Sequence, residues 1–365
     1  MDSGRETDEE KPQMSGSVAG VGLAADREHM LTHTRELWED FRGQRLFITG
    51  GTGFFGAWLL ESFAFANETL ELGAKAVVLT SDAAAFQKRA PHFSMNKGVE
   101  FLQGDMKTFA FPPGEFAHII HAATEHDSLV RPLDPTLHFD GNLEGTKRIL
   151  RFSKECGARG ILFTSSGGVY GTQPPEISHL PETYAGAPST LDCRSAYAQS
   201  KRASEFLCAA HQKTHGIATT IARCFAFVGP HLALNLNFAI GNLVADALRG
   251  GPITITGDGT PLRSYLYGAD LAIWLWTILV RGESGQAYNV GSDAALTIEE
   301  LARLVADVVN PKAEVVILQK KDPAKLPHRY VPSISRARSE LGLEPWIDLR
   351  EGIRRMAEWY RLHGL

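Results

Sequence analysis

The feature that most constrains the fold is a glycine-rich turn between a short apolar segment and a helical one. Residues 46–49 predict a strand, the segment Gly50-Gly51-Thr52-Gly53-Phe54-Phe55-Gly56 follows directly, and residues 57–66 predict a helix. Glycines in this context let backbone N–H groups approach a pyrophosphate, and the helix N-terminus adds partial positive charge. A tight turn without a ligand is the alternative, but the full context favours a dinucleotide site. Its expected residues are Gly50, Gly53, Phe54, Phe55 and Gly56.

Short apolar runs continue to alternate with helical segments along the chain. Strands are expected at residues 76–79, 99–102, 118–121, 161–164 and 217–222, and helices at residues 134–156 and 195–214. Short apolar strands separated by helices are typical of a parallel sheet covered on both faces. The sequence therefore predicts an α/β fold, namely a Rossmann-type doubly wound parallel sheet with a smaller C-terminal substrate-binding lobe.

Three regions are expected in this fold. Residues 1–40 begin polar, continue rich in Gly and Ala, and predict a mobile N-terminal arm. Residues 41–225 predict the NAD-binding Rossmann domain. Residues 226–365 predict mainly the substrate-binding lobe, with final helices near 297–309 and 349–362, and the chain can cross back to the first domain.

Composition excludes several classes of function. The chain has 365 residues, with 37 Lys and Arg against 42 Asp and Glu, and this mild acidity argues against a nucleic-acid partner. The most apolar stretch, residues 271–280, is about half of the roughly 20 residues that span a bilayer, so no membrane partner is expected. An acidic start and four widely spaced cysteines predict a cytoplasmic protein without disulfides. His211 and His215 have the spacing of a helical zinc site, but a solvated helix face is favoured and no metal is predicted.

Acidic residues near two strand ends bear on the choice of cofactor. Asp105, with Met106 beside it, follows the third strand, where it can face an adenine edge or act as a plain turn residue. Asp82 lies slightly late after the second strand, where a carboxylate accepts from a ribose 2′-hydroxyl and repels a 2′-phosphate. No arginine stands beside it in the sequence to hold a phosphate. The expected cofactor is NAD, with NADP left open.

A tyrosine and a lysine at i and i+4 predict the catalytic centre. Tyr197 and Lys201 would lie one turn apart on the same face of a helix. A free phenol has a pKa near about 10, and a cationic lysine with an oxidised nicotinamide would favour the phenolate, which makes Tyr197 a proton acceptor. Ser166 ends a strand at the carboxyl edge of the sheet, where it could hydrogen-bond the reacting oxygen.

From residue 45 to residue 306 the sequence resembles the extended short-chain dehydrogenase/reductases, in particular their nucleotide-sugar epimerase/dehydratase branch. The glycine turn, Asp105, Ser166 and the pair Tyr197 and Lys201 match its motifs in order. Further matches are His121-Ala122-Ala123, Asn142, Arg223, Gly229-Pro230, Arg263 and Tyr288-Asn289-Val290-Gly291. The resemblance adds Ala122, Ala123 and Asn142 to the cofactor site and places Arg263 against a nucleotide diphosphate.

The resemblance implies oxidation of a nucleoside-diphosphate sugar at C4, with Tyr197 taking the proton, Lys201 holding the nicotinamide ribose and Ser166 orienting the oxygen. The 4-keto sugar is then epimerised or dehydrated. Related 4,6-dehydratases carry Asp-Glu after the serine, whereas this chain has Gly167-Gly168, which favours an epimerase or another C4 redox reaction over 4,6-dehydration. The epimerase is the leading expectation, and a 4,6-dehydratase or a C4 dehydrogenase/reductase is the alternative.

Four further expectations accompany that reading. Glu125, His126 or Asp127 could replace the missing acid or base, and Glu125 and His126 are expected to contact substrate. Ala226 and Phe227 stand where the family commonly has an asparagine on the substrate diphosphate. The family also implies a homodimer that pairs two helices of each subunit, residues 134–156 and 195–214. A non-catalytic NAD(P)-sensing regulator is the alternative of another class.

Overall fold

The computed structural model describes residues 22–125, 134–234, 236, 238–324 and 326–364. At its centre is a seven-stranded sheet in the order β11-β6-β5-β4-β1-β2-β3, in which every neighbouring pair is parallel. The strands are β1 (Arg45–Thr49), β2 (Lys75–Thr80), β3 (Val99–Gln103), β4 (His118–His121), β5 (Gly160–Ser166), β6 (Ala218–Cys224) and β11 (Ala287–Val290). The strand order reverses between β1 and β4, which confirms the predicted Rossmann-type arrangement.

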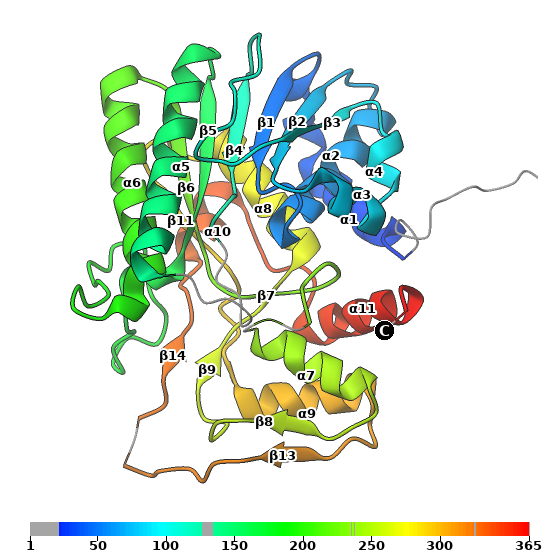
Figure 1. Cartoon of the computed structure of the whole chain (residues 1–365). Helices are drawn as coiled ribbons and strands as arrows, with labels where there is room; N and C mark the ends of the chain where they lie inside the picture. Colours follow the sequence, from blue (N-terminus) through cyan, green and yellow to red (C-terminus); the bar gives the residue numbers. More distant parts are fainter. Residues whose placement is uncertain (1–21, 126–133, 235, 237, 325, 365) are drawn as a thin grey trace, which may run out of the picture.

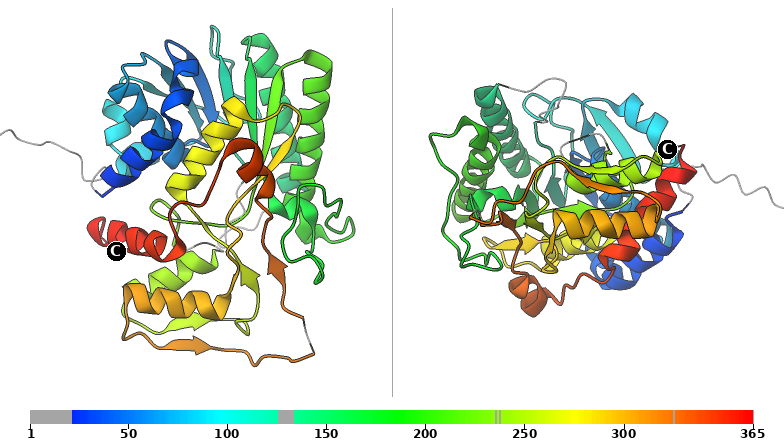
Figure 2. Two further views of the ribbon diagram at one scale, coloured as in Figure 1. Left: turned by 180° about the vertical axis from the view of Figure 1, so that it is seen from behind. Right: turned by 90° about the horizontal axis from the view of Figure 1, so that it is seen from below.

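Helices cover both faces of the sheet, because successive side chains of each buried strand point to opposite faces. Phe47 of β1 packs with α5 (Pro135–Glu155) and α6 (Ala196–His215). Its neighbours Leu46 and Ile48 belong to the core on the other face, with α2 (Phe54–Thr69) and α8 (Gly268–Arg281). Figures 1 and 2 show these two layers from the front and from behind. Two short helices, α3 (Ala83–Arg89) and α4 (His92–Met95), connect β2 to β3.

A smaller lobe lies beyond the carboxyl edge of the sheet, at the bottom of Figure 1. The chain leaves the sheet after β6 and returns to it at β11, which pairs with β6. The lobe and its connections contain β7 (Phe227–Val228), α7 (Ala239–Leu248), β8 (Ile253–Ile255), β9 (Leu262–Arg263), β10 (Leu266–Tyr267), β12 (Leu296–Thr297), α9 (Ile298–Val309), β13 (Val315–Ile317), β14 (Arg329–Tyr330), α10 (Ser335–Leu341) and α11 (Leu349–Leu362).

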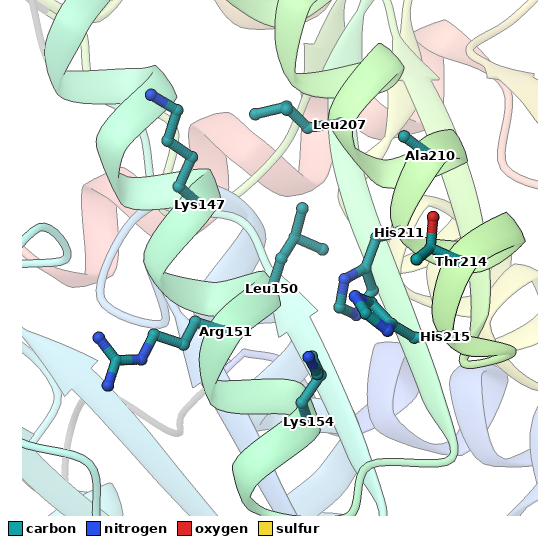
Figure 3. A pocket seen from close by; sticks show the side chains of 9 residues that line it. All are labelled: Lys147, Leu150, Arg151, Lys154, Leu207, Ala210, His211, Thr214 and His215. Atoms are coloured by element: carbon teal, nitrogen blue, oxygen red, sulfur yellow. The ribbon is translucent and has the colours of Figure 1, made fainter.

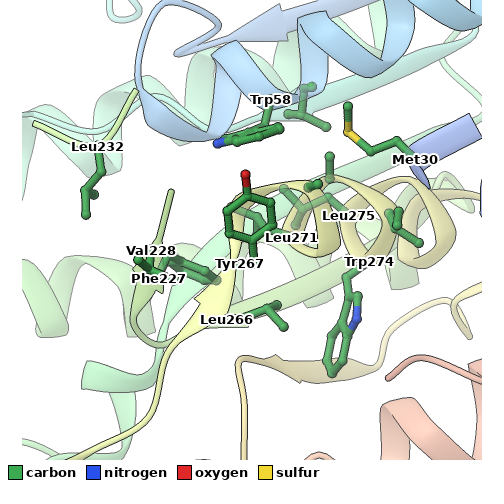
Figure 4. Packing of buried hydrophobic residues seen from close by; sticks show 14 of the residues in the cluster. Met30, Trp58, Phe227, Val228, Leu232, Leu266, Tyr267, Leu271, Trp274 and Leu275 are labelled. Atoms are coloured by element: carbon green, nitrogen blue, oxygen red, sulfur yellow. The ribbon is translucent and has the colours of Figure 1, made fainter. Parts of the chain in front are cut away.

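The structure corrects the mobile arm predicted for residues 1–40, since its described part is folded. Leu23 is fully buried, and it is followed by the helix α1 (Ala24–Thr34) and the 3-10 helix η2 (Arg35–Phe41). Met30 of α1 and Trp38 of η2 are buried in the same core as Leu23. Met30 lies in the cluster drawn in Figure 4 with Trp58 and Leu275. Residues 1–21 lie outside the described residues.

Polar contacts hold this segment and explain why its composition is misleading. Asp26 is buried, accepts from the Tyr267 hydroxyl at 2.9 Å and pairs with Arg355 of α11. Arg27 pairs with the buried Glu61 of α2 at 2.7 Å. Charged side chains dilute the apolar pattern, although here they pair with partners far along the chain. Among the described residues, no helix has both the length and the apolar character needed to cross a membrane.

Candidate active site

The glycine turn places the end of β1 against the end of β4. Gly50 has φ +71°, and a Cβ atom added to it would lie 2.6 Å from backbone atoms of Ala122 and Ala123. Gly56 faces Gly51 so closely that a Cβ would lie 2.1 Å from its Cα. Only glycine permits these approaches, and they leave the first N–H groups of α2 facing the turn. This cradle fits the pyrophosphate of a dinucleotide.

Phe54 and Phe55 form the first turn of the helix that follows. Their half-buried rings pack against Phe227, with centroid distances of 6.2 and 5.0 Å. Gly53 N–H donates to the Gly50 carbonyl at 3.1 Å, which closes the turn. The two phenylalanines therefore help to fix the start of α2.

A buried histidine fixes the segment after β4. Ala122 N–H donates to the Thr49 carbonyl at 3.2 Å, and Ala123 N–H donates to Thr49 Oγ1 at 3.1 Å. The same hydroxyl lies 2.8 Å from His121 Nδ1. Burial lowers the pKa of His121 to about 3, so its ring is neutral and can accept the Thr49 proton. Ala122 and Ala123 are thereby held against the glycine turn.

The ends of β2 and β3 hold the other cofactor residues expected from the sequence. Asp82 Oδ1 accepts from Ala85 N–H at 2.8 Å and caps α3, so this carboxylate is already engaged. Asp105 is exposed and accepts from Lys107 N–H at 2.7 Å, whereas Met106 is buried against Gly145 of α5.

One arginine reaches the glycine turn that the sequence spacing did not indicate. Arg89 lies at the end of α3, and its guanidinium donates to the Thr52 carbonyl at 2.5 Å. The prediction that no arginine stands at the end of the second strand concerned only the residues beside Asp82, whereas Arg89 reaches the glycine turn from the end of α3. The helix α3, about two turns long, carries Arg89 back to the glycine turn, which local spacing does not reveal.

Asn142 is completely engaged inside the protein. Its Oδ1 accepts from the Thr124 hydroxyl at 2.8 Å and from Glu125 N–H at 2.9 Å. Its Nδ2 donates to the His138 carbonyl and to Ser200 Oγ, both at 3.1 Å. Asn142 therefore joins the segment after β4 to α5 and α6 and supports the site from behind.

Glu125 faces Lys107 and is already paired. The ammonium of Lys107 lies 2.5 Å from Glu125 Oε1, and a Cβ on Gly141 would lie 2.4 Å from Glu125 Cγ. The carboxylate is therefore paired with Lys107, and the side chain of Glu125 lies over Gly141 of α5. His126 and Asp127 lie outside the described residues.

Ser166, Tyr197 and Lys201 come together at the carboxyl edge of β5. Ser166 is buried and accepts from Gly168 N–H at 3.0 Å, and its hydroxyl is near enough to Tyr197 to act on the pKa of that phenol. Lys201 is also buried; its Nζ donates to the Thr164 carbonyl at 2.9 Å and lies 5.8 Å from the centroid of the Tyr197 ring. The structure thus brings the predicted trio into one site.

Burial dominates the ionisation of this trio in the protein alone. It raises the pKa of Tyr197 to about 12, while the hydrogen bond with Ser166 acts in the opposite direction and does not offset it. Burial also lowers the pKa of Lys201 to about 8. The expected lowering of the tyrosine pKa by Lys201 is therefore not seen here, because the desolvation of the phenolate outweighs an ammonium that is bonded to a carbonyl.

Tyr330, which no sequence pattern identified, completes the site. Its hydroxyl lies 2.7 Å from the point that a Cβ on Gly167 would occupy, which places it beside Ser166. Its ring packs on Phe225 at 4.6 Å. Tyr330 belongs to β14, which pairs with β9 so that Tyr330 and Arg263 are partners in the register.

Arg263 reaches the site through this pairing. Its guanidinium carbon lies 5.9 Å from the centroid of the Tyr330 ring, and Nη1 donates to the Leu262 carbonyl at 2.8 Å. Arg223, another family marker, instead pairs with Glu205 at 2.7 Å and donates to the Tyr170 hydroxyl at 3.0 Å. Arg263 therefore belongs with the site, whereas Arg223 is held beneath it.

A Rossmann sheet with a glycine turn and a Ser-Tyr-Lys trio at its carboxyl edge defines an extended short-chain dehydrogenase/reductase. More specifically, the chain belongs to the NAD dependent epimerase/dehydratase family, whose model matches residues 46–291. It is an NAD-dependent enzyme of this family, and the glycine cradle fits that cofactor.

Named relatives and solved structures agree with this assignment. The chain is 31% identical over 318 residues to UDP-glucuronic acid decarboxylase 3 of Arabidopsis thaliana, covering 87% of this chain and 89% of the relative. It is similar to the structure of UDP-glucose 4-epimerase of Thermus thermophilus in complex with NAD, with 27% identity, a TM-score of 0.71 and coverage of 87% and 99%. It is also similar to the structure of a dTDP-glucose 4,6-dehydratase of Streptomyces venezuelae with NAD bound, with 25% identity and a TM-score of 0.72. That match covers 87% of this chain and 97% of the other.

Proposed function

We propose that this enzyme epimerises a nucleoside-diphosphate sugar through a transient 4-keto sugar. Tyr197 accepts the proton of the C4 hydroxyl, and Ser166 orients that oxygen. NAD, when bound at the glycine turn, would supply the hydride chemistry at C4, accepting the hydride and giving it back on the opposite face of the sugar. Arg263 is positioned on the substrate side, where a guanidinium can bind a diphosphate.

The observation that carries this proposal is that no acid or base side chain stands at the two positions after Ser166. Gly167 and Gly168 have no side chain to exchange protons with C5 or C6. The hydroxyl of Tyr330 and the ring of Phe225 fill the place of a side chain at 167, each 2.7 Å from its Cβ position. Glu125 is bound to Lys107 at 2.5 Å, which argues against its use as the substitute acid. Oxidation and reduction at C4 need no such group.

Decarboxylation is a second candidate, supported by the 31% identity to UDP-glucuronic acid decarboxylases. A sugar that carries a carboxylate on C5 becomes a β-keto acid when C4 is oxidised. The C5–C6 bond then breaks, CO2 leaves, the electron pair passes to the C4 oxygen as an enolate, and a proton adds at C5. This sequence also needs no carboxylate at residue 167 or 168.

A panel of nucleotide sugars decides between these outcomes. The protein is incubated with NAD and UDP-, dTDP-, GDP- and CDP-hexoses, or with UDP-glucuronate, and the products are identified by mass spectrometry and NMR. An isomer of unchanged mass is the expected result. Loss of CO2 from the uronate establishes the second candidate, and loss of water contradicts both and points to an acid in residues 126–133.

We infer that two copies pair through α5 and α6. Leu137 on α5 and Phe206 on α6 are large apolar side chains with 62% and 71% exposure. Between these helices lies a groove of about 390 Å³, shown in Figure 3, whose basic residues include Lys147 and Arg151. Each of these two lies 2.9 Å from a glutamate of its own helix, which offsets part of the positive charge that a facing copy would meet. The cytoplasmic location expected from the sequence stays a prediction.

The solution mass tests this pairing. Gel filtration with light scattering should give twice the chain mass of 39.9 kDa. Phe206→Glu should shift the protein to the monomer mass, because a charge at the centre of the apolar contact is desolvated without a partner. Leu318→Glu, a matched change at a residue of 62% exposure in the other lobe, should remain dimeric. A monomeric wild-type protein contradicts the inference.

A further inference from the structure

The guanidinium of Arg89 lies where the glycine turn meets the end of β2. It donates to the Thr52 carbonyl, and Thr52 Oγ1 lies 3.1 Å from the Oγ1 of Thr80, the last residue of β2. In a Rossmann fold the adenosine ribose of the cofactor lies at this corner, beside the end of the second strand. We propose that Arg89 binds a phosphate on the ribose 2′-oxygen, so that the site accepts NADP as well as NAD.

The end of β2 carries hydroxyl groups at the place where a carboxylate would select NAD. Such a carboxylate accepts from the ribose 2′-hydroxyl and repels a 2′-phosphate. Here the strand ends at Thr80, which is buried, and Ser81 follows it. Thr80 Oγ1 also accepts from Asp82 N–H at 3.3 Å, so it is fixed between the strand end and the glycine turn. Neutral hydroxyls tolerate either a hydroxyl or a phosphate on the ribose.

Asp82 uses its carboxylate at the start of α3 instead. Its Oδ1 accepts from Ala85 N–H at 2.8 Å and caps the helix. The negative charge remains, but the side chain is exposed to water, where salt screens its repulsion of a phosphate. Asp82 therefore opposes a 2′-phosphate only weakly, and Arg89, at the other end of the same helix, provides the opposite charge.

Arg89 is held in place for such a contact. The helix α3 is anchored by Phe86, which is buried and stacks on the buried Phe93 of α4 with 5.7 Å between the ring centroids. The guanidinium carbon of Arg89 lies 5.3 Å from the centroid of the Phe86 ring. A guanidinium has several N–H donors in one plane, and one of them is used on the Thr52 carbonyl. In the part of the chain that the structure describes, no carboxylate pairs with the others, so they can donate to a phosphate.

Direct binding of the two dinucleotides tests the proposal without any sugar. Isothermal titration calorimetry of the full chain should give Kd values for NAD and NADP that lie within about tenfold of each other. Arg89→Gln should raise the Kd for NADP by about 10- to 100-fold, the size of a charge-assisted hydrogen bond, and should leave the Kd for NAD within about threefold of the wild-type value.

Two further variants separate a direct contact from the general field of the helix. Lys88→Gln is the matched control, since it removes the same charge from the neighbouring exposed position of α3, and it should change the Kd for NADP by less than about threefold. Asp82→Asn keeps an oxygen that can cap the helix but removes the negative charge, so it should lower the Kd for NADP by about two- to fivefold. A variant that only distorts the glycine turn would raise both Kd values together.

Two adenosine nucleotides isolate the 2′-phosphate from the nicotinamide half of the cofactor. Adenosine 2′,5′-bisphosphate should bind the wild-type protein more tightly than 5′-AMP does, and Arg89→Gln should remove the difference. The proposal is overturned if NADP does not bind at concentrations that saturate the protein with NAD. An equal loss of NAD and NADP in Arg89→Gln, or an equal effect of Lys88→Gln, overturns it as well. None of these measurements depends on turnover, so a failure of the proposed epimerisation would leave them unaffected.

Discussion

Replacing Tyr197 by phenylalanine is expected to lower turnover of the nucleotide sugar by on the order of 10²–10⁴-fold while NAD still binds. The ring that lies 5.8 Å from His138 is retained, and only the hydroxyl beside Ser166 is lost. The change should appear in kcat, and a direct titration should show an unchanged Kd for NAD.

The pH dependence of turnover by the wild-type enzyme tests whether Tyr197 acts as a base. Tyr197 acts as a base only in its deprotonated form, and burial raises its pKa to about 12 in the protein alone. Turnover should therefore rise with pH across the neutral range and fall as the phenol is protonated. Tyr288→Phe, at a buried tyrosine whose hydroxyl contacts Glu340 instead, should leave this profile in place. Turnover that survives in Tyr197→Phe would contradict the assignment of Tyr197 as the base. If neither protein turns over a nucleotide sugar and the variant still supports the protein's function in the cell, the NAD(P)-sensing regulator is favoured.

The central sheet could be predicted because its signals are local. Six of the seven strands contain the short apolar runs that predicted them, and the residues of the glycine turn are consecutive, so their geometry follows from neighbours along the chain. The strand β11, with Asn289 in it, was not predicted. Tyr197 and Lys201 lie one helical turn apart for the same reason. The family motifs placed Ser166 beside them, and the structure confirms that meeting.

Contacts between distant segments could not be predicted. Tyr330 reaches Ser166 through β14, a strand of two residues that pairs with another strand of two residues, and so short a run has no period to detect. The helix α1 is held by Asp26 and Arg27, whose partners lie on α11 and α2. Such residues look solvent-exposed in the sequence, and their burial depends on partners that only the fold supplies.

Gly50→Ala is expected to abolish NAD binding and to destabilise the fold by more than about 2 kcal/mol. Two costs add. Alanine at φ +71° is strained, and its Cβ would lie 2.6 Å from the Ala122 carbonyl. The backbone there cannot move away freely, because both Ala122 and Ala123 donate to Thr49. Thermal unfolding and titration with NAD measure the two effects.

Gly53→Ala is the matched control for the effect of Gly50→Ala on stability, because it adds a methyl group at the same turn. Gly53 has φ −84°, and a Cβ there would lie 3.5 Å from the nearest atom, the Gly50 carbonyl oxygen, which is an ordinary contact. As the N-cap of α2, this position should lose at most about 1 kcal/mol on substitution. Its Tm should therefore stay close to that of the wild type while that of Gly50→Ala falls. Equal Tm values for the two variants would mean that the segment after β4 moves to accommodate the added methyl group. The packing of the glycine turn against Ala122 and Ala123 would then not determine the shape of the cradle.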